Sequence, residues 1–385
     1  MNRRLFIQTL AATFTAAALS TAAAAPILSQ QAQGANHMTH AQNPTLPVSM
    51  VQEWDKIFPQ NSNVSHQKVS FKNRYGITLV GDLYLPKSAS GKLPAIAVSG
   101  PFGAVKEQSS GLYAQELAAR GFVTLAFDGS YTGESGGEPR NMASPEINTE
   151  DFSAAVDYLG RLKNVNRENI GILGVCGWGG FALNAAVSDP RIKAVAVSTM
   201  YDMTRVNANG YEIKLDPKGQ YDRVPAQDAD ARYKMKLDMS NARWEAAKHD
   251  YADLLPANNL DPEKDITAET PKFVAEYANF YRTKRGFHPR SVNSNPKGSW
   301  TTTAFLPFIN MPILQRASEL RAPALVVHGE IAHSRYFGED AFKSLGSKDK
   351  ELVIVKGANH TDLYDNTTGK IPFDKFEAFF KAKLK

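Results

Sequence analysis

The only cysteine of the chain stands where a nucleophile is expected. Cys176 lies in the run Gly-Val-Cys-Gly-Trp-Gly-Gly at residues 174–180. Residues 170–175 form an apolar run with the length and branching of a buried strand, and a helical pattern follows directly. A strand, a tight turn with one nucleophilic side chain, and a helix make a nucleophile elbow. The turn is sharp, so its flanking positions need residues without bulk, which glycine provides.

The position of Cys176 also predicts how its thiol is activated. At the amino end of a helix, the sulfur atom lies beside unpaired backbone N–H groups and the positive end of the helix dipole. Both favour the thiolate, which is the reactive form. The N–H of Gly177 would face an oxyanion formed on an attacked carbonyl group. The sequence therefore predicts attack by sulfur on an acyl carbon.

Two other interpretations use the same residues. A lone cysteine can be a small buried hydrophobic residue, which would indicate a binding protein that kept the fold. Residues 177–182 also fit the dinucleotide pattern G-x-G-x-x-A, which would indicate a nucleotide-dependent oxidoreductase. That pattern normally belongs to the first strand–helix unit of its fold, whereas several strands precede it here, and Trp178 would crowd a pyrophosphate. We therefore predict no bound cofactor, and the absence of metal-ligand spacings predicts no metal site.

The elements that must position these residues alternate between strands and helices. Two strands at the start are predicted to pair antiparallel around a turn at residues 73–76. The helix that precedes the elbow is predicted to be capped by Asn148 or Thr149. This alternation predicts an α/β fold with a mostly parallel sheet covered by helices on both faces. The predicted strands are 64–71, 77–85, 95–98, 122–127, 170–175, 192–197, 324–327 and 352–355, and the predicted helices outside the interval that follows Met200 are 112–120, 148–162, 181–189, 337–345 and 373–384.

The alternation breaks after Met200. Between about residues 203 and 312, helical pieces at 229–236, 241–254 and 271–282 are separated by polar, proline-containing loops. This interval is far longer than a usual connection of roughly two to six residues. We interpret it as a helical cap over the site, whose frequent aromatic side chains form its own core and in part line a pocket.

Over about residues 64–385, the chain resembles the α/β-hydrolase fold. The elbow, the cap insertion and a Gly-Ala-Asn-His run at 357–360 after the last strand occur in the order of that fold. With a thiol nucleophile, the chain is similar to the dienelactone hydrolase family and to bacterial and fungal relatives that include acyl-transferring polyketide transferases. The resemblance implies a triad in the chain order nucleophile, acid, base.

The general base is expected among eight histidines. The resemblance implies His360, because it follows the last strand and an imidazole suits proton transfer near neutral pH. His333 is the second candidate, and His328, at the end of a strand, is predicted to be a structural hydrogen-bonding residue. The others lie in the leader region, the opening strand pair or the cap: His37, His40, His66, His249 and His288.

The acid is expected in the loop after His328, where the fold often carries H-G-x-x-D. Here Ala332 occupies the position of the acid. Glu330 is the nearest carboxylate and the first prediction. Asp202, after the strand that follows the elbow, is the alternative acid, and Asp340 is the third. A thiol nucleophile depends less on this third member, because a thiol is already fairly acidic.

The second oxyanion donor is expected in the loop after strand 95–98. The run Ser-Gly-Pro-Phe-Gly at 99–103 stands where the fold often has H-G-F-G. Proline has no N–H, so Phe102 is the predicted donor beside Gly177. Trp178 stands where a small residue is usual, and we expect it either to alter the turn or to form a wall of the pocket. Asp128 is predicted to be structural.

Composition and the N-terminal residues predict the class of protein and its location in the cell. The chain has 385 residues, of which 43% are hydrophobic and 22% charged, as in an ordinary soluble protein. Its net charge is +5, and the sequence has no cluster of basic residues that would predict binding to nucleic acid. Residues 2–8 resemble a twin-arginine motif, and the uncharged run up to Ala25 is too weakly hydrophobic for a membrane span. We predict a signal peptide at 1–25, a linker at 26–47 and an exported, periplasmic domain at 48–385 without a stable membrane anchor.

Together these observations predict a hydrolase for a carboxylic ester, lactone or thioester. Its partner would be a small-molecule acyl substrate, which Cys176 would hold as an acyl-thioenzyme. An acyltransferase with the same thiol is the alternative, since the acyl group can pass to an alcohol or amine instead of water.

Overall fold

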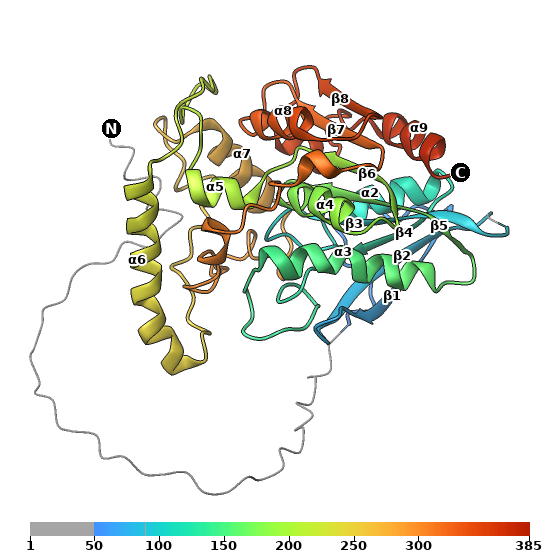
Figure 1. Ribbon diagram of the computed structural model, residues 1–385, viewed down its shortest axis with the longest axis horizontal. Coiled ribbons are helices and arrows are strands. Elements are labelled where there is room, and N and C mark those ends of the chain that lie inside the picture. Colours follow the sequence, from blue (N-terminus) through green and yellow to red (C-terminus); the bar gives the residue numbers. More distant parts are fainter. Residues whose placement is uncertain (1–49, 89) are drawn as a thin grey trace, which may run out of the picture.

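The central feature of the fold is one eight-stranded sheet with the strand order β1-β2-β4-β3-β5-β6-β7-β8 (Figure 1). The computed structural model describes residues 50–88 and 90–385, so the predicted signal peptide and linker lie outside the described residues. The β1–β2 and β2–β4 pairs are antiparallel, and every other neighbouring pair in this sheet is parallel. The strands are β1 (Val64–Lys72), β2 (Thr78–Pro86), β3 (Leu93–Ser99), β4 (Val123–Phe127), β5 (Val165–Val175), β6 (Ile192–Ser198), β7 (Ala324–Gly329) and β8 (Lys350–Val355).

The inner strands are nearly continuous runs of small and β-branched apolar residues. All five residues of β4 and all six of β7 are buried. A parallel strand covered on both faces has this composition, whereas the edge strand β1 is mostly polar, and of its nine residues only Val64 and Phe71 are buried. Each predicted strand is present, and the predicted α/β-hydrolase class with a mostly parallel sheet is confirmed.

Helices cover both faces of the sheet and divide the core into two layers. Phe152 of α3 and Phe181 of α4 pack in one layer, while Tyr113 of α2 and Phe376 of α9 pack in the other. In Figure 1, α3 lies below the sheet and α9 above it. The helices around the sheet are α2 (Ser109–Ala119), α3 (Pro145–Gly160), α4 (Gly177–Ser188), α8 (Arg335–Ser344) and α9 (Phe373–Lys383).

One predicted helix start is wrong. Helix α3 begins at Pro145, and its cap is Ser144, whose Oγ accepts from the N–H of Ile147 at 3.3 Å. Asn148 and Thr149, the predicted caps, lie inside the helix. Proline at the first helical position has its backbone angle preset and lacks an N–H that would go unpaired there, so the helix starts earlier than the polar pair suggests.

The long connection between β6 and β7 carries three helices. They are α5 (Met203–Asn209), α6 (Ala229–Ala246) and α7 (Lys272–Tyr281), and short 3₁₀ turns include η2 (Pro307–Ile309). The cap predicted at about 203–312 falls within this connection. Helix α7 lies against the sheet domain, whereas α6 stands at the side farthest from the sheet (Figure 1).

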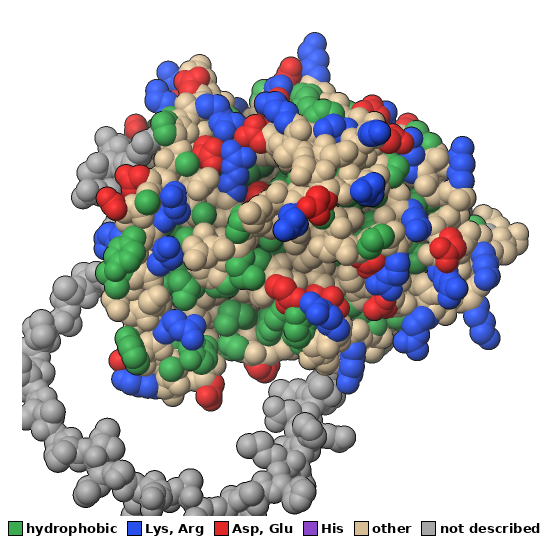
Figure 2. Space-filling view, in the orientation of Figure 1, with side chains coloured by type: hydrophobic (Ala, Val, Ile, Leu, Met, Phe, Trp, Pro, Cys, Tyr) green, Lys and Arg blue, Asp and Glu red, His purple; other side chains and the backbone are tan. Residues whose placement is uncertain are grey.

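The surface carries charges of both signs. Figure 2 shows lysine and arginine side chains interspersed with aspartate and glutamate over the visible face. Hydrophobic side chains gather on the side of α6, where Tyr233 is 65% exposed and Trp244 is 76% exposed. Within the described part of the chain, no helix has the length and apolar character needed to cross a membrane.

Candidate active site

Cys176 occupies the sharp turn between β5 and α4. Its backbone has φ 56° and ψ −126°, the left-handed region that is uncommon for a side chain with a Cβ. A Cβ on Gly174 would come within 2.3 Å of the carbonyl oxygen of Trp178, so only glycine fits at that point of the turn. Strain at one residue, held by its close-packed surroundings, is the geometry of a nucleophile elbow.

Backbone amides and phenol groups surround the thiol. The N–H groups of Gly177 and Phe102 both form hydrogen bonds to Cys176, and so do the hydroxyls of Tyr364 and Tyr277. The structure therefore brings both predicted oxyanion donors to the predicted nucleophile. The two amides come from different loops, one after β3 and one at the start of α4, and converge from two sides.

The loop that carries Phe102 is held by the connection between β6 and β7. The Nδ2 group of Asn293 donates to the Phe102 carbonyl at 2.8 Å, and the Ser291 hydroxyl donates to the Gly103 carbonyl at 2.9 Å. A Cβ on Gly100 would lie 2.1 Å from the Val175 carbonyl oxygen. Glycine at this position therefore allows the oxyanion loop to contact the end of β5 closely. The orientation of one oxyanion donor thus depends on residues distant in sequence.

His360 is completely buried beside these groups. Its Nε2 atom is 2.9 Å from the Tyr364 hydroxyl, and its Nδ1 atom is 2.9 Å from the Thr199 hydroxyl and 2.5 Å from the Ser334 hydroxyl. Thr199 has φ 45°, which is a strained conformation for a β-branched residue. The imidazole is therefore fixed at both nitrogens, as a general base must be.

The predicted acids do not contact His360. Glu330 lies on the surface and accepts from the N–H of Gly357 at 2.8 Å. Asp202 caps helix α5 and accepts from the N–H of Thr204 and of Arg205 at 3.0 Å each. At the His360 Nδ1 atom, where a carboxylate was expected, the structure has the hydroxyl groups of Thr199 and Ser334.

Asp340, the third predicted acid, is also engaged elsewhere. Its carboxylate pairs with Arg205 at 3.0 Å and with Arg223 at 3.2 Å. The expectation of a carboxylate at His360 is therefore corrected for the described residues. The motif H-G-x-x-D predicts the acid at position 332, but the residue of this loop that contacts the imidazole is Ser334, two residues later.

The electrostatics of the site correct a second expectation. Burial raises the pKa of the Cys176 thiol above its ordinary value, although the hydrogen bonds from Tyr364, Gly177 and Phe102 act in the opposite direction. Burial, and the neighbouring imidazoles of His333 and His328, hold the pKa of His360 well below its ordinary value. Helix-end activation is thus outweighed by desolvation, and the resting site is a neutral thiol beside a neutral imidazole.

This protonation state can be measured directly, because Cys176 is the only cysteine. We expect no thiolate absorbance step between pH 4 and pH 8 in an ultraviolet titration, with Cys176→Ala as the blank. With a raised pKa, the thiolate fraction at pH 7 stays at about 1% or less. A step in the acidic range would mean a thiolate–imidazolium pair and would contradict this description.

The structure also gives the contacts of three other residues considered in the sequence analysis: Trp178, His328 and His333. Trp178 packs away from the thiol, with its ring 5.6 Å from those of Phe127 and Phe152, so it fills the core below the elbow and forms no wall of the site. His328 is buried, and its Nε2 lies 3.2 Å from the Met200 carbonyl, which confirms its structural role. His333 is hydrogen-bonded to the Tyr201 hydroxyl through Nε2.

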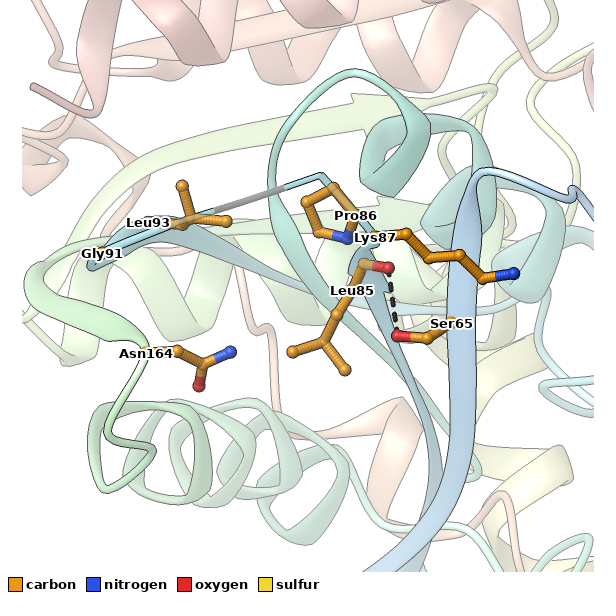
Figure 3. Close-up of a pocket in the computed structure, with 7 residues that line it drawn as sticks. All are labelled: Ser65, Leu85, Pro86, Lys87, Gly91, Leu93 and Asn164. Carbon is orange, nitrogen blue, oxygen red and sulfur yellow. Dashed lines mark hydrogen bonds between the residues drawn. The ribbon is translucent and has the colours of Figure 1, made fainter.

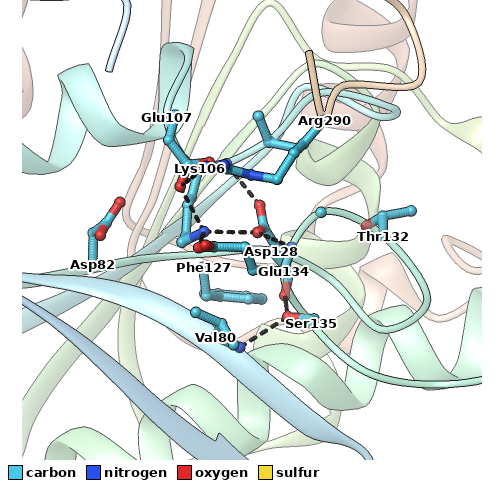
Figure 4. Close-up of polar contacts among 12 residues, drawn as sticks. Val80, Asp82, Lys106, Glu107, Phe127, Asp128, Thr132, Glu134, Ser135 and Arg290 are labelled. Atoms are coloured by element: carbon cyan, nitrogen blue, oxygen red, sulfur yellow. Dashed lines mark hydrogen bonds and ion pairs between the residues drawn. The ribbon is translucent and has the colours of Figure 1, made fainter. Parts of the chain in front are cut away.

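Asp128 belongs to a buried cluster of charges next to the oxyanion loop (Figure 4). The ammonium group of Lys106 lies 2.9 Å from Asp128, 2.6 Å from Glu134 and 2.7 Å from Glu107. Asp128 also accepts from the N–H of Lys106 at 2.7 Å, which confirms its predicted structural role. Arg290 lies 2.9 Å from Glu107, so the β6–β7 connection is joined to this cluster.

A cavity of about 310 Å³ lies at the other edge of the sheet (Figure 3). It is lined by residues from the end of β2, the start of β3 and the loop before β5, including Leu85, Leu93 and Asn164. Cys176 follows the carboxyl end of β5, whereas this cavity lies at the amino ends of β3 and β5. It is therefore separate from the candidate active site.

Comparison with known proteins places the chain in a family. Residues 75–331, well over half of the chain, match the X-Pro dipeptidyl-peptidase (S15) family. The chain belongs to this family. An S15 chain with this sheet and elbow is a hydrolase of the α/β-hydrolase superfamily, and the coarser part of the resemblance seen in the sequence is confirmed.

Relatives of this S15 chain differ in how much of it they cover. An uncharacterized protein, PA2218 of Pseudomonas aeruginosa, is 52% identical over 341 residues, covering 88% of this chain and 86% of its own. Its crystal structure superposes with a TM-score of 0.81 over 88% of this chain and all of that one. A thiohydrolase, aneE of Aspergillus aculeatus, is 35% identical over 135 residues, 35% of this chain and 42% of its own. The α/β hydrolase GrgF of a Penicillium species shares the fold, with a TM-score of 0.58 at 23% identity over 83% of this chain and 99% of that one.

Sequence reasoning missed the polar residues that surround the S15 site. Tyr364 and Tyr277 at the thiol, and Thr199 and Ser334 at the imidazole, were not predicted. One signal was present, because Tyr364 follows His360 by four residues, the spacing that returns a helical turn to the same side. No local pattern marks the other three, which come from separate segments.

Proposed function

We propose that this protein is a cysteine-dependent acyl hydrolase that cleaves a carboxylic ester, lactone or thioester. One observation carries the proposal: the single cysteine lies at a strained elbow between two converging N–H groups, and a buried imidazole lies one tyrosine away. A sulfur atom and two oxyanion donors in this arrangement suit attack on an acyl carbon.

Two steps complete the proposed reaction. Cys176 attacks the carbonyl carbon as its proton moves toward His360, and the N–H groups of Gly177 and Phe102 hold the oxyanion. Collapse expels an alcohol or thiol and leaves an acyl-thioenzyme. Water then attacks this thioester with His360 as its base, which restores the thiol. No cofactor or metal is required by these steps.

The surroundings of the thiol favour a neutral acyl group. After burial, the largest contributions to the Cys176 pKa come from the hydroxyls of Tyr364 and Tyr277 and the backbone N–H groups of Gly177 and Phe102, which are all uncharged. Release of a dipeptide, as the family description names it, begins from a peptide amino terminus, and a buried ammonium group needs a carboxylate partner. Esters and thioesters of uncharged acyl groups fit the site better, in line with the dienelactone hydrolase resemblance and the thiohydrolase name of one relative.

Acyl transfer is the second candidate, and one observation favours it. Cys176 is only 7% exposed, lies in an apolar cluster and has the phenols of Tyr364 and Tyr277 beside it, so water has little access to an acyl-thioenzyme. An alcohol or amine that fills the site could then compete with water. The resemblance to polyketide transferases points to the same reaction.

The test is to trap the acyl group on the enzyme. We expect brief mixing with an activated ester, such as p-nitrophenyl acetate, followed by acid quenching and mass spectrometry, to show one added acyl group on the peptide that contains Cys176. Decay of this species in buffer alone supports hydrolysis, and faster decay with formation of a new ester or amide in the presence of an acceptor supports transfer. Acylation at another residue, or turnover without any acyl-enzyme, would refute the proposal.

We propose separately that the protein is located in the periplasm. Export to the periplasm by the twin-arginine route is supported by the residue pattern of 1–25.

A further inference from the structure

We propose that Tyr364 is a catalytic residue whose hydroxyl carries the proton from Cys176 to His360. The inference deepens the acyl-transfer chemistry proposed above and depends on it. It starts from two observations: the Tyr364 hydroxyl lies 2.9 Å from the His360 Nε2 atom, and Tyr364 and Cys176 shift each other's pKa as hydrogen-bond partners. In the described part of the chain, the hydrogen-bond partners of His360 are Thr199, Ser334 and Tyr364, and Tyr364 is the one of these that also acts on the Cys176 pKa.

The directions of the hydrogen bonds fit a relay. Two hydroxyls lie at Nδ1 of His360, from Thr199 and Ser334, and either can accept the Nδ1–H of a neutral imidazole. The Nε2 atom is then an acceptor, so the Tyr364 O–H must donate to it. While the thiol is neutral, the lone pairs of the Tyr364 oxygen can accept the S–H of Cys176, and the chain S–H to O–H to Nε2 is complete before substrate arrives. With a thiolate, the O–H would donate to sulfur instead, which is the arrangement that lowers the thiol pKa.

A second phenol touches the thiol but leads to a poorer base. The Tyr277 hydroxyl also forms a hydrogen bond to Cys176, and it lies 3.5 Å from the His333 Nε2 atom. That separation is too long for a good hydrogen bond. The Nδ1 atom of His333 is buried and has no hydrogen-bond partner among the described residues, so a protonated His333 would hold a buried positive charge with an unpaired N–H. His360, with both nitrogens partnered, accepts a proton at lower cost.

The relay keeps every proton accounted for. As sulfur bonds to the acyl carbon, the S–H proton passes to the Tyr364 oxygen while the original Tyr364 proton passes to Nε2. The carbonyl electrons move onto oxygen, where the Gly177 and Phe102 amides bind them. When the bond to the leaving group breaks, Nε2 returns its proton to Tyr364, and Tyr364 gives one to the departing oxygen or sulfur. Burial holds the pKa of Tyr364 well above its ordinary value, so the phenol transfers protons without accumulating as an anion.

The experiment measures the first turnover with an activated ester in mixtures of H₂O and D₂O. Two protons move together in the relay, so the wild-type rate of acylation should fall along a curved line as the D₂O fraction rises. In Tyr364→Phe we expect acylation to slow on the order of 10²-fold, the usual contribution of a positioned proton donor, and the dependence on D₂O to become linear. A linear dependence in the wild type would overturn the relay even if the variant failed to fold.

A double-mutant cycle tests whether His360 acts through Tyr364. We expect His360→Gln to slow acylation strongly in the wild type and to add less than about threefold in the Tyr364→Phe background, since residues that act as one unit are not additive. Independent, multiplying effects would overturn the proposal. Tyr277→Phe serves as the comparison, and its dependence on D₂O should remain curved. Equal loss of curvature in both tyrosine variants would also overturn it.

A buried tyrosine outside the site provides the folding control. Tyr336→Phe removes a hydroxyl that accepts from the N–H of Glu212 at 3.3 Å, and its acylation rate should match the wild type. Cys176→Ala separates the two levels of inference. If that variant still forms an acyl-enzyme, the proposed function fails. If it does not, and Tyr364→Phe reacts at the wild-type rate, only the relay fails.

Discussion

Cys176→Ala is expected to lose ester turnover by about 10⁴-fold or more, which is at least about 5.4 kcal/mol of transition-state stabilisation. The reason is geometric, because the described site offers no second nucleophile between the Gly177 and Phe102 amides. The variant should keep its fold, since alanine also tolerates burial at this position and leaves the hydrogen bonds of the elbow backbone unchanged. Initial rates with p-nitrophenyl acetate, corrected for the uncatalysed reaction, measure the effect.

The matched control for this prediction is Glu330→Gln. Its carboxylate lies on the surface, bonded to the N–H of Gly357 and without contact to His360, so kcat/KM should stay within about threefold of the wild type. A loss of activity in Glu330→Gln comparable to that in Cys176→Ala would reinstate the carboxylate predicted from the sequence. Wild-type activity in Cys176→Ala would remove the sulfur from the mechanism.

Lys106→Met is expected to lower the free energy of unfolding by about 3–5 kcal/mol, the usual cost of breaking a buried ion pair. Asp128 and Glu107 have completely buried side chains, and removal of the ammonium group would leave them without a partner on that side. Burial by itself would raise the pKa of Glu107, but the positive charges of Lys106, Arg290 and Lys68 hold it well below its ordinary value. Denaturant unfolding of both proteins at pH 7 measures the difference.

The pH dependence follows from the lowered pKa values in the same cluster, and the raised pKa of Asp128, which burial causes, acts in the opposite direction. In the wild type, the lowered pKa values of Glu107 and Glu134 contribute stability that is present above about pH 4.5 and is lost as the pH falls through the folded-state values. In Lys106→Met the stranded carboxylates take up protons more readily, so the deficit should shrink toward acidic pH.

Lys234→Met is the control for this prediction. Lys234 pairs with Asp238 at 3.1 Å, but its side chain is 76% exposed, so the change should stay within about 0.5 kcal/mol. Equal effects of the two substitutions, or a Lys106→Met protein as stable as the wild type, would show that the cluster contributes nothing. Because Lys106 follows the oxyanion loop directly, its loss should also reduce activity.

The fold followed from the sequence because its signals are local. Strands such as β7, Ala-Leu-Val-Val-His-Gly, are apolar throughout because both faces are covered, and the helices between them have their own periodicity. The elbow was equally readable, since Gly174 and Cys176 mark a turn that few other residues could make. The start of α3 was misjudged where a proline and a serine outweighed a later polar pair.

The residues that surround the thiol and the imidazole could not be predicted from local sequence signals. Two contacts orient the His360 ring at Nδ1: Ser334 lies 26 positions before it in the chain and Thr199 lies 161 before it. The expectation of a thiolate failed for a related reason. It counted the helix end, which is local, but not the burial that the β6–β7 connection and the last loop impose on the sulfur.

The sequence by itself determined the α/β-hydrolase sheet, the position of Cys176 at the elbow and the amides that face it, because these depend on hydrophobic period and on the backbone freedom of glycine. Only the tertiary structure decided what lies beside the thiol and the imidazole: Tyr364 next to both, hydroxyls in place of a carboxylate, and a burial that keeps both groups neutral. The physical reason is that desolvation and hydrogen-bond partners are set by segments far apart in the chain, and no local pattern of residues encodes their meeting.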